Sequence, residues 1–565
     1  MNTLTSLPSR LGIGRLARFV PDRFRPTPRD ERPAPAIGRY AHRHFLRRYR
    51  WLCFLALTVF ALLYGFAFAL FGRYLLVQLT APLVILTGIT LWVLPDMARV
   101  PERWLPPMLT VFVFGLLCWP DYIAFAVPGL PWVTMTRLTG VPLTIILLVC
   151  VSCSAAFRAR IAEICSATPW LWKLLVAFMV IAGLSIALSS NIVFSINRYV
   201  LALYSWAAVF VVAAYVFVQP GRIRRFAYYL WFIAIYVSVI GVYEARYSRL
   251  PWAGRIPSFL KIEDPQILYI LSGVSRAATG VYRVQSKFGI SLGLGEFLGM
   301  SVPFILHIMV TARRLWVRVA AFATLPMIFY VVLRTDSRLA VIGFFMSILI
   351  YLFFWASMRW YRQKDSLFGP LITLGYPAIF MAFIVLSFAW RRLEVLVWGG
   401  GAQQNSTDAR RYQYEAGLRM VAKNPIGHGI GEGAQTLGYI APGADMLTID
   451  TYYLAVALEF GVVGFIVYYA MVVLGIWHSG KTAIMTRDPE LAFMGAACIA
   501  MINFLISKSV FSQTENHPLM FIMLGLIVAA VFRERALSPA TTTAARKGIG
   551  KMSGVAGRAP VLGAA

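Results

Sequence analysis

The sequence predicts an all-α polytopic membrane protein, and three observations support this prediction. The mean hydropathy is +0.70, and 59% of the residues are hydrophobic. Only 14% are charged, far below the quarter that is usual in soluble domains. Apolar runs of about 20 residues, each long enough to cross a hydrocarbon core, recur along most of the chain. Short alternating strands, which a closed β-barrel would show, are not a feature of the sequence.

These runs predict about 14 transmembrane helices. The expected spans are 51–72, 76–95, 107–127, 139–156, 170–188, 199–218, 226–243, 288–310, 315–333, 338–356, 369–388, 451–476, 490–508 and 517–534. If the N-terminus is cytoplasmic, the segments that then also face the cytoplasm carry clusters of arginine, as the positive-inside rule requires. These clusters include Arg99, Arg158, Arg222, Arg313 and Arg359. Both termini are therefore expected in the cytoplasm.

The same reasoning divides the chain into membrane bundles, loops and terminal segments. We expect a basic cytoplasmic N-terminal arm (1–50), an N-terminal transmembrane bundle (51–243), a periplasmic loop (244–287), transmembrane helices (288–388), a large periplasmic catalytic loop (389–449), C-terminal transmembrane helices (450–534) and a disordered cytoplasmic tail (535–565). Most external loops between the two large ones have only a few residues. We therefore expect the function to lie in those two loops, on the outer face of the inner membrane.

The N-terminal arm holds twelve arginines and three acids. It contains no early apolar core and no small-residue cleavage site, so it does not resemble a cleavable signal peptide. Attraction to anionic lipid on the cytoplasmic side explains its charge better than nucleic-acid binding does.

The two large external loops are rich in arginine, which the positive-inside rule does not favour. They and the short turn between two spans carry Arg246, Arg249, Arg255, Arg276, Arg283, Lys261, Lys287, Arg334, Arg338, Arg391, Arg392, Arg410, Arg411, Arg419 and Lys423. About half of these cations are explained by solvation or by nearby acids such as Glu244 and Glu415. The others form a cationic surface suited to an anionic, lipid-linked ligand, because a planar guanidinium binds phosphate oxygens in a bidentate way.

The second loop contains a predicted helix. Ser406 or Thr407 can cap its start, and Pro425 follows its end. Within it, Arg410, Tyr414 and Leu418 are spaced to share one face. The spacing of Arg411 and Glu415 favours a plain ion pair.

After this helix comes Gly427-His428-Gly429-Ile430-Gly431. A nucleotide-binding motif is a weak interpretation, because no strand precedes these glycines. Glycines that permit a sharp turn or a close backbone approach explain the run better. His428 could act as a base, although a single loop histidine without a visible partner is more often incidental. No cluster of His, Cys, Asp or Glu has metal-ligand spacing, and Cys150-x-x-Cys153 reads as membrane packing, so no metal and no cofactor are expected.

Asp450 lies at the mouth of the next apolar span, where it can be interpreted in two ways. One interpretation is a base that accepts a proton. The other is a cap for the predicted helix from Tyr452 onward, since an acid there is favoured by hydrogen bonding and by the helix dipole. Glu296 and Glu459 lie inside apolar spans, where charge is costly. Both can be explained by bonding between helices, and neither is assigned to the site.

Three stretches resemble the superfamily of O-antigen ligases and O-antigen (exopolysaccharide) polymerases. Arg276-Ala-Ala-Thr-Gly280 is similar to an arginine motif that enters a membrane helix, and Ser337-Arg338 opens a span as the family's Ser-Arg pair does. The third stretch is the second loop with its exit helix. It comprises Arg410 with Tyr414, Asn-Pro-x-Gly-x-Gly at 424–429, Asp450-x-x-Tyr453-Leu454 and Leu458-Glu459-Phe460-Gly461.

The resemblance implies a metal-independent glycosyltransferase that acts on a glycan carried by undecaprenyl pyrophosphate. It implies catalytic roles for Asp450, Arg410 and Arg276 and pyrophosphate contacts by Arg338, Arg283 and Arg411. Gly427, Gly429, Tyr414 and Tyr453 would shape the loop. Ligases usually have a histidine where this chain has Asp450, so the resemblance favours the polymerase branch. The implied partners are membrane lipids, a glycan or lipid A-core acceptor, a flippase and a chain-length regulator.

Other functions remain open from the sequence. An O-antigen ligase and a cell-wall glycan polymerase are enzymatic alternatives, the second with poorer agreement in the loop motifs. A lipid-linked oligosaccharide flippase or transporter often shows paired, similar halves, and no clear repeat is visible here. A lipid-binding scaffold without chemistry is the remaining alternative.

Overall fold

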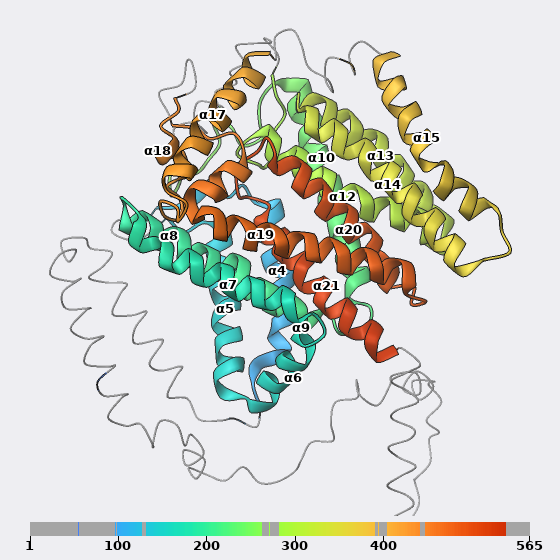
Figure 1. Ribbon diagram of the computed structural model, residues 1–565, viewed down its shortest axis with the longest axis horizontal. Helices are drawn as coiled ribbons and strands as arrows, with labels where there is room; N and C mark the ends of the chain where they lie inside the picture. The colour runs from blue at the N-terminus through green and yellow to red at the C-terminus, as the bar shows by residue number, and fades with distance from the viewer. Residues whose placement is uncertain are drawn as a thin grey trace, which may run out of the picture.

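The computed structural model describes residues 99–126, 132–262, 282–389, 404–440 and 447–537, together with Leu55, Met97, Leu271 and Glu394. The N-terminal arm, the first two expected spans, Arg276 and the C-terminal tail lie outside the described residues. The described chain is mostly helical (Figure 1). Its longer helices are α4 (Leu105–Cys118), α5 (Met135–Cys153), α6 (Ala155–Cys165), α7 (Pro169–Ser185), α8 (Ile192–Ala202), α9 (Val209–Val216), α10 (Arg222–Tyr247), α12 (Ser291–Thr311), α13 (Leu315–Arg334), α14 (Arg338–Arg362), α15 (Phe368–Ala389), α17 (Gln404–Lys423), α19 (Tyr452–Met485), α20 (Met494–Lys508) and α21 (His517–Leu537).

Within the described residues, ten helical stretches are long and apolar enough to cross a membrane. The helices α8 and α9 form one such stretch, Ile192–Val216, joined by the π-helix η7 (Leu203–Ala208). Two further expected spans are helical but are not among the ten: α21, and α4, which has only 14 residues. The chain is thus a multi-pass helical membrane protein.

Contacts between the connecting segments separate into two ends of the helix bundle. At one end, called the loop end here, hydrogen bonds join described segments of the chain, namely 119–126, 132–134, 185–191, 248–262, 282–290, 334–338, 404–440, 447–451 and 508–517. At the opposite end, Arg533 pairs with Asp488 and Glu490, and Glu490 accepts the backbone N–H groups of Gly221 and Ile223. Helices that alternate in direction across a membrane produce such a division.

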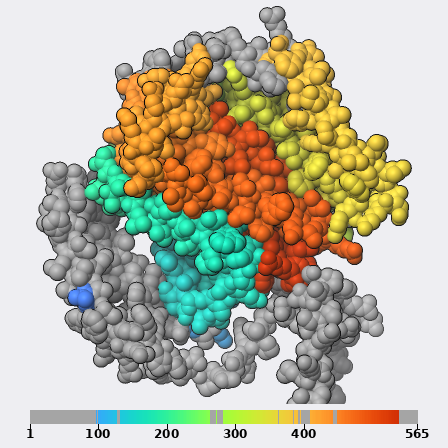
Figure 2. All heavy atoms as spheres, viewed as in Figure 1, coloured from blue at the N-terminus to red at the C-terminus, as the bar shows by residue number. Residues whose placement is uncertain are grey.

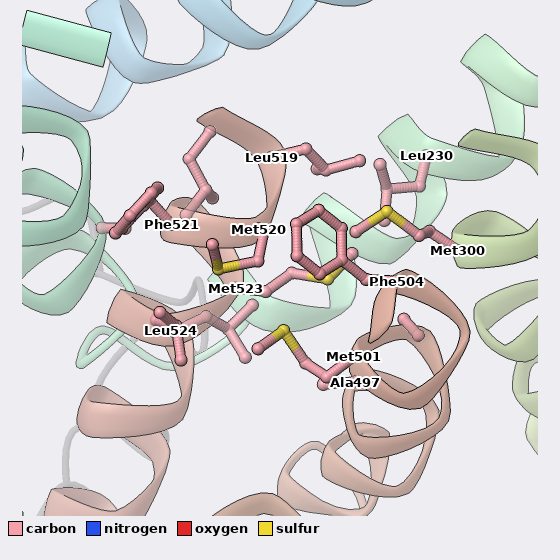
Figure 3. Close-up of a cluster of buried hydrophobic side chains, with 14 of the residues drawn as sticks. Leu230, Met300, Ala497, Met501, Phe504, Leu519, Met520, Phe521, Met523 and Leu524 are labelled. Atoms are coloured by element: carbon pink, nitrogen blue, oxygen red, sulfur yellow. The ribbon is translucent and has the colours of Figure 1, made fainter. Parts of the chain in front are cut away.

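The core of the bundle is formed by α12, α20 and α21 around a cluster of methionine and aromatic side chains. Met300, Met501, Phe504, Met520 and Met523 are fully buried there (Figure 3). Long, unbranched methionine side chains fill irregular gaps between helices well.

A helix at the edge of the bundle makes much less contact with the rest. The helix α15 packs against α14 and stands at the margin of the molecule (Figures 1 and 2). Its apolar side chains, including Leu371, Leu374 and Leu386, are largely exposed. In a membrane, such side chains face lipid.

One element departs from the all-α expectation. The strand β1 (Ile123–Phe125) pairs antiparallel with β2 (Leu260–Ile262), with Ala124 opposite Lys261. The span expected at 107–127 therefore ends earlier, at Cys118, and the chain continues as a strand. The two strands have three residues each, too few for alternation to be recognised in the sequence.

The expected span 451–476 is also different, because α19 is broken within its length. Gly461 has φ 68° and ψ −173°, which no α-helix contains. The chain therefore forms a short helix that begins at Tyr452 and a longer one that ends at Met485. The short first helix lies at the loop end, beside α17 and α18 (Gly433–Leu437) (Figure 1).

Candidate functional site

The break in α19 is occupied by the loop that contains the Asn-Pro-x-Gly-x-Gly motif. The N–H groups of His428 and Gly429 donate to the carbonyl oxygens of Leu458 and Glu459, at 2.9 and 3.0 Å. In return, Val462 donates to the carbonyl oxygen of Pro425, at 2.9 Å. This exchange satisfies backbone groups that the interrupted helix would otherwise leave without partners. The two motifs, far apart in the sequence, therefore form one structural unit.

Glycine is required at the contacts between these two segments. Gly427, Gly429 and Gly461 all have φ between 68° and 107°, a region that other residues rarely adopt. A Cβ atom at Gly427 would lie 2.6 Å from the carbonyl oxygen of Glu459, and one at Gly429 would lie 2.8 Å from Ser189. His428 adds a contact from its Nδ1 to the Leu458 carbonyl oxygen, at 3.1 Å. Backbone packing thus explains why glycines recur in this loop.

The helix α17 lies along the first part of α19 and brings the loop's polar side chains to its start. Gln413 and Gly417 face inward, and Gly417 contacts Leu454. Arg410 and Tyr414 lie on the same inner side and are partly buried. Leu418, which was expected on the face of Arg410 and Tyr414, is 59% exposed. Eight residues advance a helix by more than two full turns, so the third member of the set is rotated away.

Arg410 and Asp450 meet where α17 approaches the start of α19. The Arg410 Nε atom lies 3.9 Å from a carboxylate oxygen of Asp450, and the two side chains are 25% and 35% exposed. Burial raises the pKa of Asp450 above its ordinary value, and the positive charge of Arg410 opposes this shift. The result is a partly accessible carboxylate with more basic character than a solvated aspartate has.

Four further contacts hold the residues around Asp450. Its N–H donates to Oε1 of Gln413, at 2.9 Å. The hydroxyl of Ser512 donates to the carbonyl oxygen of Ile449. Thr451 Oγ1 is 2.9 Å from the hydroxyl of Tyr414 and also donates to the carbonyl oxygen of Lys508, at 3.4 Å. Asp450 is therefore held from both α17 and the connection that follows α20.

The structure gives the N-cap position of α19 to Thr451, not to Asp450. Thr451 has extended backbone angles, and no side chain makes a capping hydrogen bond at this helix start. Asp450 lies one residue earlier, where its carboxylate faces Arg410. The helix-cap explanation of Asp450 is therefore wrong for this structure.

The other arginines predicted for the site lie at several places. Arg283 donates to the carbonyl oxygen of Thr335, at 2.9 Å, and so braces the turn that leads to Arg338 at the start of α14. Arg411 is 81% exposed and pairs with Glu415 at 3.1 Å, as its spacing predicted. Tyr453 donates its hydroxyl to the carbonyl oxygen of Leu505 and stacks on Tyr469. Arg283 and Arg411 thus bond to residues outside the Arg410–Asp450 pair.

Two charged residues of the predicted loop 244–287 are buried. Lys287 is 2% exposed and donates to the carbonyl oxygen of Leu116, at 2.8 Å. Glu244, expected as a partner for an arginine, accepts hydrogen bonds from the hydroxyl of Tyr282 and the N–H groups of Gln285 and Ser286. These two residues therefore hold the stretch 282–290 in place.

Beneath Asp450 lies a buried charged cluster that the sequence analysis did not assign. Lys508 and Glu296 form an ion pair at 3.0 Å, and neither side chain is exposed. Asn516 donates to Glu296 Oε2, at 2.9 Å. Glu296 was noted as a charge within an apolar span and set aside. Lys508 is likewise a charged residue in an apolar span, at the end of α20. Nothing in the sequence indicates that it pairs with Glu296.

A second missed contact holds the glycine-rich loop against the connection between α7 and α8. Glu432 is 3% exposed and accepts hydrogen bonds from the hydroxyls of Ser189 and Ser190. Ser195 donates to the carbonyl oxygen of Ile430, at 2.7 Å. Within the described residues, no group of three or more His, Cys, Asp or Glu side chains could hold a metal ion.

The fold and the site define a multi-pass helical membrane protein in which a loop and a broken helix present an arginine–aspartate pair. Residues 323–469 match the family model described as O-antigen ligase. This match, over about a quarter of the chain, supports the resemblance to the O-antigen ligase/polymerase superfamily that the motifs indicated. The matched segment contains Arg338, Arg410 and Asp450. No curated protein matches the chain.

Proposed function

We propose that the chain is an inner-membrane glycosyltransferase that polymerises lipid-linked oligosaccharide repeat units on the periplasmic face. The donor in this proposal is a glycan attached to undecaprenyl pyrophosphate, and the acceptor is the glycan of a second lipid-linked unit. The observation that carries the proposal is the Arg410–Asp450 pair within the segment matched by the O-antigen ligase family.

The chemistry requires a base for the acceptor and a cation for the leaving group. The acceptor hydroxyl oxygen forms a bond to the anomeric carbon of the donor glycan, and the bond from that carbon to the pyrophosphate oxygen breaks. The electron pair of the broken bond leaves with the pyrophosphate, and the hydroxyl proton moves to the carboxylate of Asp450. A base placed in this way contributes about 10²- to 10⁴-fold in rate.

Arg410 has two roles in this proposal. Its positive charge favours the ionised form of Asp450, because it opposes the effect of burial on the pKa of that carboxyl. Its guanidinium can also stabilise the negative charge that develops on the pyrophosphate. A donor placed where charge develops lowers the barrier by roughly 3 kcal/mol in comparable sites. Arg338 and Arg276 are proposed as further pyrophosphate contacts, and the transfer needs no metal.

The polymerase branch is favoured over a ligase by Asp450 itself. Ligases of this superfamily usually have a histidine at the corresponding junction, and an acid there resembles the polymerases. The ligase alternative, transfer of a finished glycan to lipid A-core, has in its favour that the matching family model is described as O-antigen ligase.

Reconstitution separates the two activities. The purified chain is placed in liposomes with undecaprenyl-pyrophosphate-linked repeat units, with and without lipid A-core. A ladder of products without lipid A-core supports the polymerase. Product that appears only on lipid A-core, in a single step, supports the ligase and overturns the polymerase proposal.

A further inference from the structure

The buried ion pair between Glu296 and Lys508 joins helices that are distant in the sequence. Glu296 comes from α12 and Lys508 is the last residue of α20. The Lys508 Nζ atom lies 3.0 Å from Oε1 and 3.2 Å from Oε2 of Glu296. Asn516, from the connection between α20 and α21, donates to the same carboxylate and to the carbonyl oxygen of Gly293.

An arrangement of this kind is poorly explained by stability alone. Removing two charges from water costs about as much as their attraction returns, so well-packed apolar residues often replace buried ion pairs without loss. Here both side chains are fully buried. The surroundings of Lys508 include the rings of Phe504, Phe511 and Tyr452, which could equally accommodate an apolar side chain. The pair is therefore better explained by the geometry that it imposes on the residues around it.

Lys508 makes contacts around the connection 508–517 through both its side-chain ammonium group and its backbone carbonyl group. Its Nζ atom donates to the carbonyl oxygen of Gln513, at 2.7 Å, which folds the connection back over the end of α20. Its own carbonyl oxygen accepts a hydrogen bond from Thr451. From the same connection, Ser512 donates to the carbonyl oxygen of Ile449.

These contacts reach the residues on either side of Asp450. Ile449 is held by Ser512, and Thr451 is held by the Lys508 backbone and by Tyr414. Glu296 thus acts on the position of Asp450 through Lys508 and the connection.

We propose that Glu296 and Lys508 are positioning residues that hold the backbone of Asp450 in register with Arg410. This proposal rests on the proposed function for its catalytic consequence. Its structural consequence, the fixed position of residues 449–451, is independent of which reaction the chain catalyses.

The test compares the double variant E296Q K508M with a matched control at the opposite end of the bundle. The double variant removes both charges, so that neither is left buried and unpaired. The control is R533M, which breaks the buried pairs of Arg533 with Asp488 and Glu490, far from Asp450. K508R, which keeps the charge, serves as the conservative variant.

Two measurements are made on each purified, full-length variant in liposomes. Amide hydrogen exchange is followed for the peptide that covers 447–456, and kcat and KM are measured with undecaprenyl-pyrophosphate-linked repeat units. We expect exchange in this peptide to be at least about 10-fold faster in E296Q K508M, because hydrogen exchange reports local opening. We expect kcat to fall at least about 10-fold with KM nearly unchanged, because misplacing a base affects the transition state more than ground-state binding. R533M should change neither the exchange of this peptide nor kcat. K508R should retain most of the wild-type activity.

Each outcome decides the proposal. Unchanged exchange in E296Q K508M overturns it, whether or not activity falls, because the pair then does not hold residues 449–451. Faster exchange with wild-type kcat shows that the pair fixes the segment without serving catalysis, which also overturns the positioning role. If the wild-type chain makes no product, the proposed function fails while the exchange data still decide whether the pair fixes Asp450. If E296Q K508M fails to fold, the same two measurements on S512A, which removes only the hydroxyl that holds Ile449, decide between these outcomes.

Discussion

Arg410 and Asp450 face each other at 3.9 Å, one from the middle of α17 and the other from the residue before the N-cap of α19. Their approach depends on two structural conditions. The helix α17 must lie along the first part of α19, and α19 must break at Gly461 so that the glycine-rich loop can pack into the interruption.

The pH dependence of transfer should report the ionisation of Asp450. Burial raises the pKa of this carboxyl, so the contribution of Asp450 to folding stability is largest at low pH and is lost as pH rises through its folded-state pKa. Only the ionised form can act as the base. Activity should therefore increase with pH over the same interval, above the range of an ordinary aspartate.

In R410Q the loss of the positive charge should raise the pKa of Asp450 further, and the rising limb of kcat against pH should move to higher pH. A limb that stays in place, or moves to lower pH, would show that Asp450 is not the titrating group.

Loss of Arg410 should also lower the rate at the pH optimum. We expect R410A to reduce kcat by about 10²-fold, the effect of removing one well-placed cationic donor. The matched control is R419A on the same helix, where the Arg419 side chain is exposed and donates to the backbone of Glu415. R419A should retain activity within about twofold, as measured by product per molecule of folded protein. Equal losses in both variants would assign the effect to the general charge of α17.

Gly461 should tolerate substitution much less than Gly438. Both have positive φ, at 68° and 64°. A Cβ atom at Gly461 would collide with the backbone of Pro425 and Ile426, whereas nothing lies within 4 Å of one at Gly438. G438A should cost only the local strain of a left-handed residue, about 1 kcal/mol. G461A should in addition separate the two motifs, with a much larger drop in the melting temperature of the purified protein. Similar melting temperatures for the two variants would argue against the interlocked backbone.

Cysteine labelling tests which end of the bundle faces the periplasm. In a background without the six native cysteines, R255C places a thiol in an exposed segment of the loop end, and R487C places one in an exposed segment at the opposite end. A membrane-impermeant maleimide should label R255C in whole cells, and R487C only after the inner membrane is permeabilised. The reverse pattern would invert the proposed topology and remove the periplasmic site.

The sequence was sufficient for the helical membrane fold and for naming Arg410 and Asp450 as candidate residues, because apolar runs and short motifs are local signals, but it did not predict that the two residues meet. Apolar runs mark the spans, and the order of Arg410, the Asn-Pro-x-Gly-x-Gly motif and Asp450 indicated the resemblance that the family model over residues 323–469 supports. The spacing of Arg411 and Glu415 likewise indicates their ion pair, since a helix places such residues together.

What the sequence did not reveal depends on contacts between distant segments. Gly461 lies in an apolar run whose one charged residue is Glu459, and the packing of the loop at Pro425 explains why the helix breaks there. The partner of Glu296 is Lys508, more than two hundred residues later, and no spacing rule links them. The N-cap of α19 is Thr451, one residue after the candidate Asp450. The backbone angles that distinguish these two positions cannot be read from the sequence.

The most direct test of the central claim is the product ladder made by wild-type chain and by D450N in liposomes. Both contain undecaprenyl-pyrophosphate-linked repeat units and no lipid A-core. We expect the wild type to form a ladder and D450N, at equal amounts of folded protein, to form at least about 10²-fold less product, because an amide cannot accept the proton of the acceptor hydroxyl. A ladder of wild-type yield from D450N would contradict the assignment of Asp450 as the base.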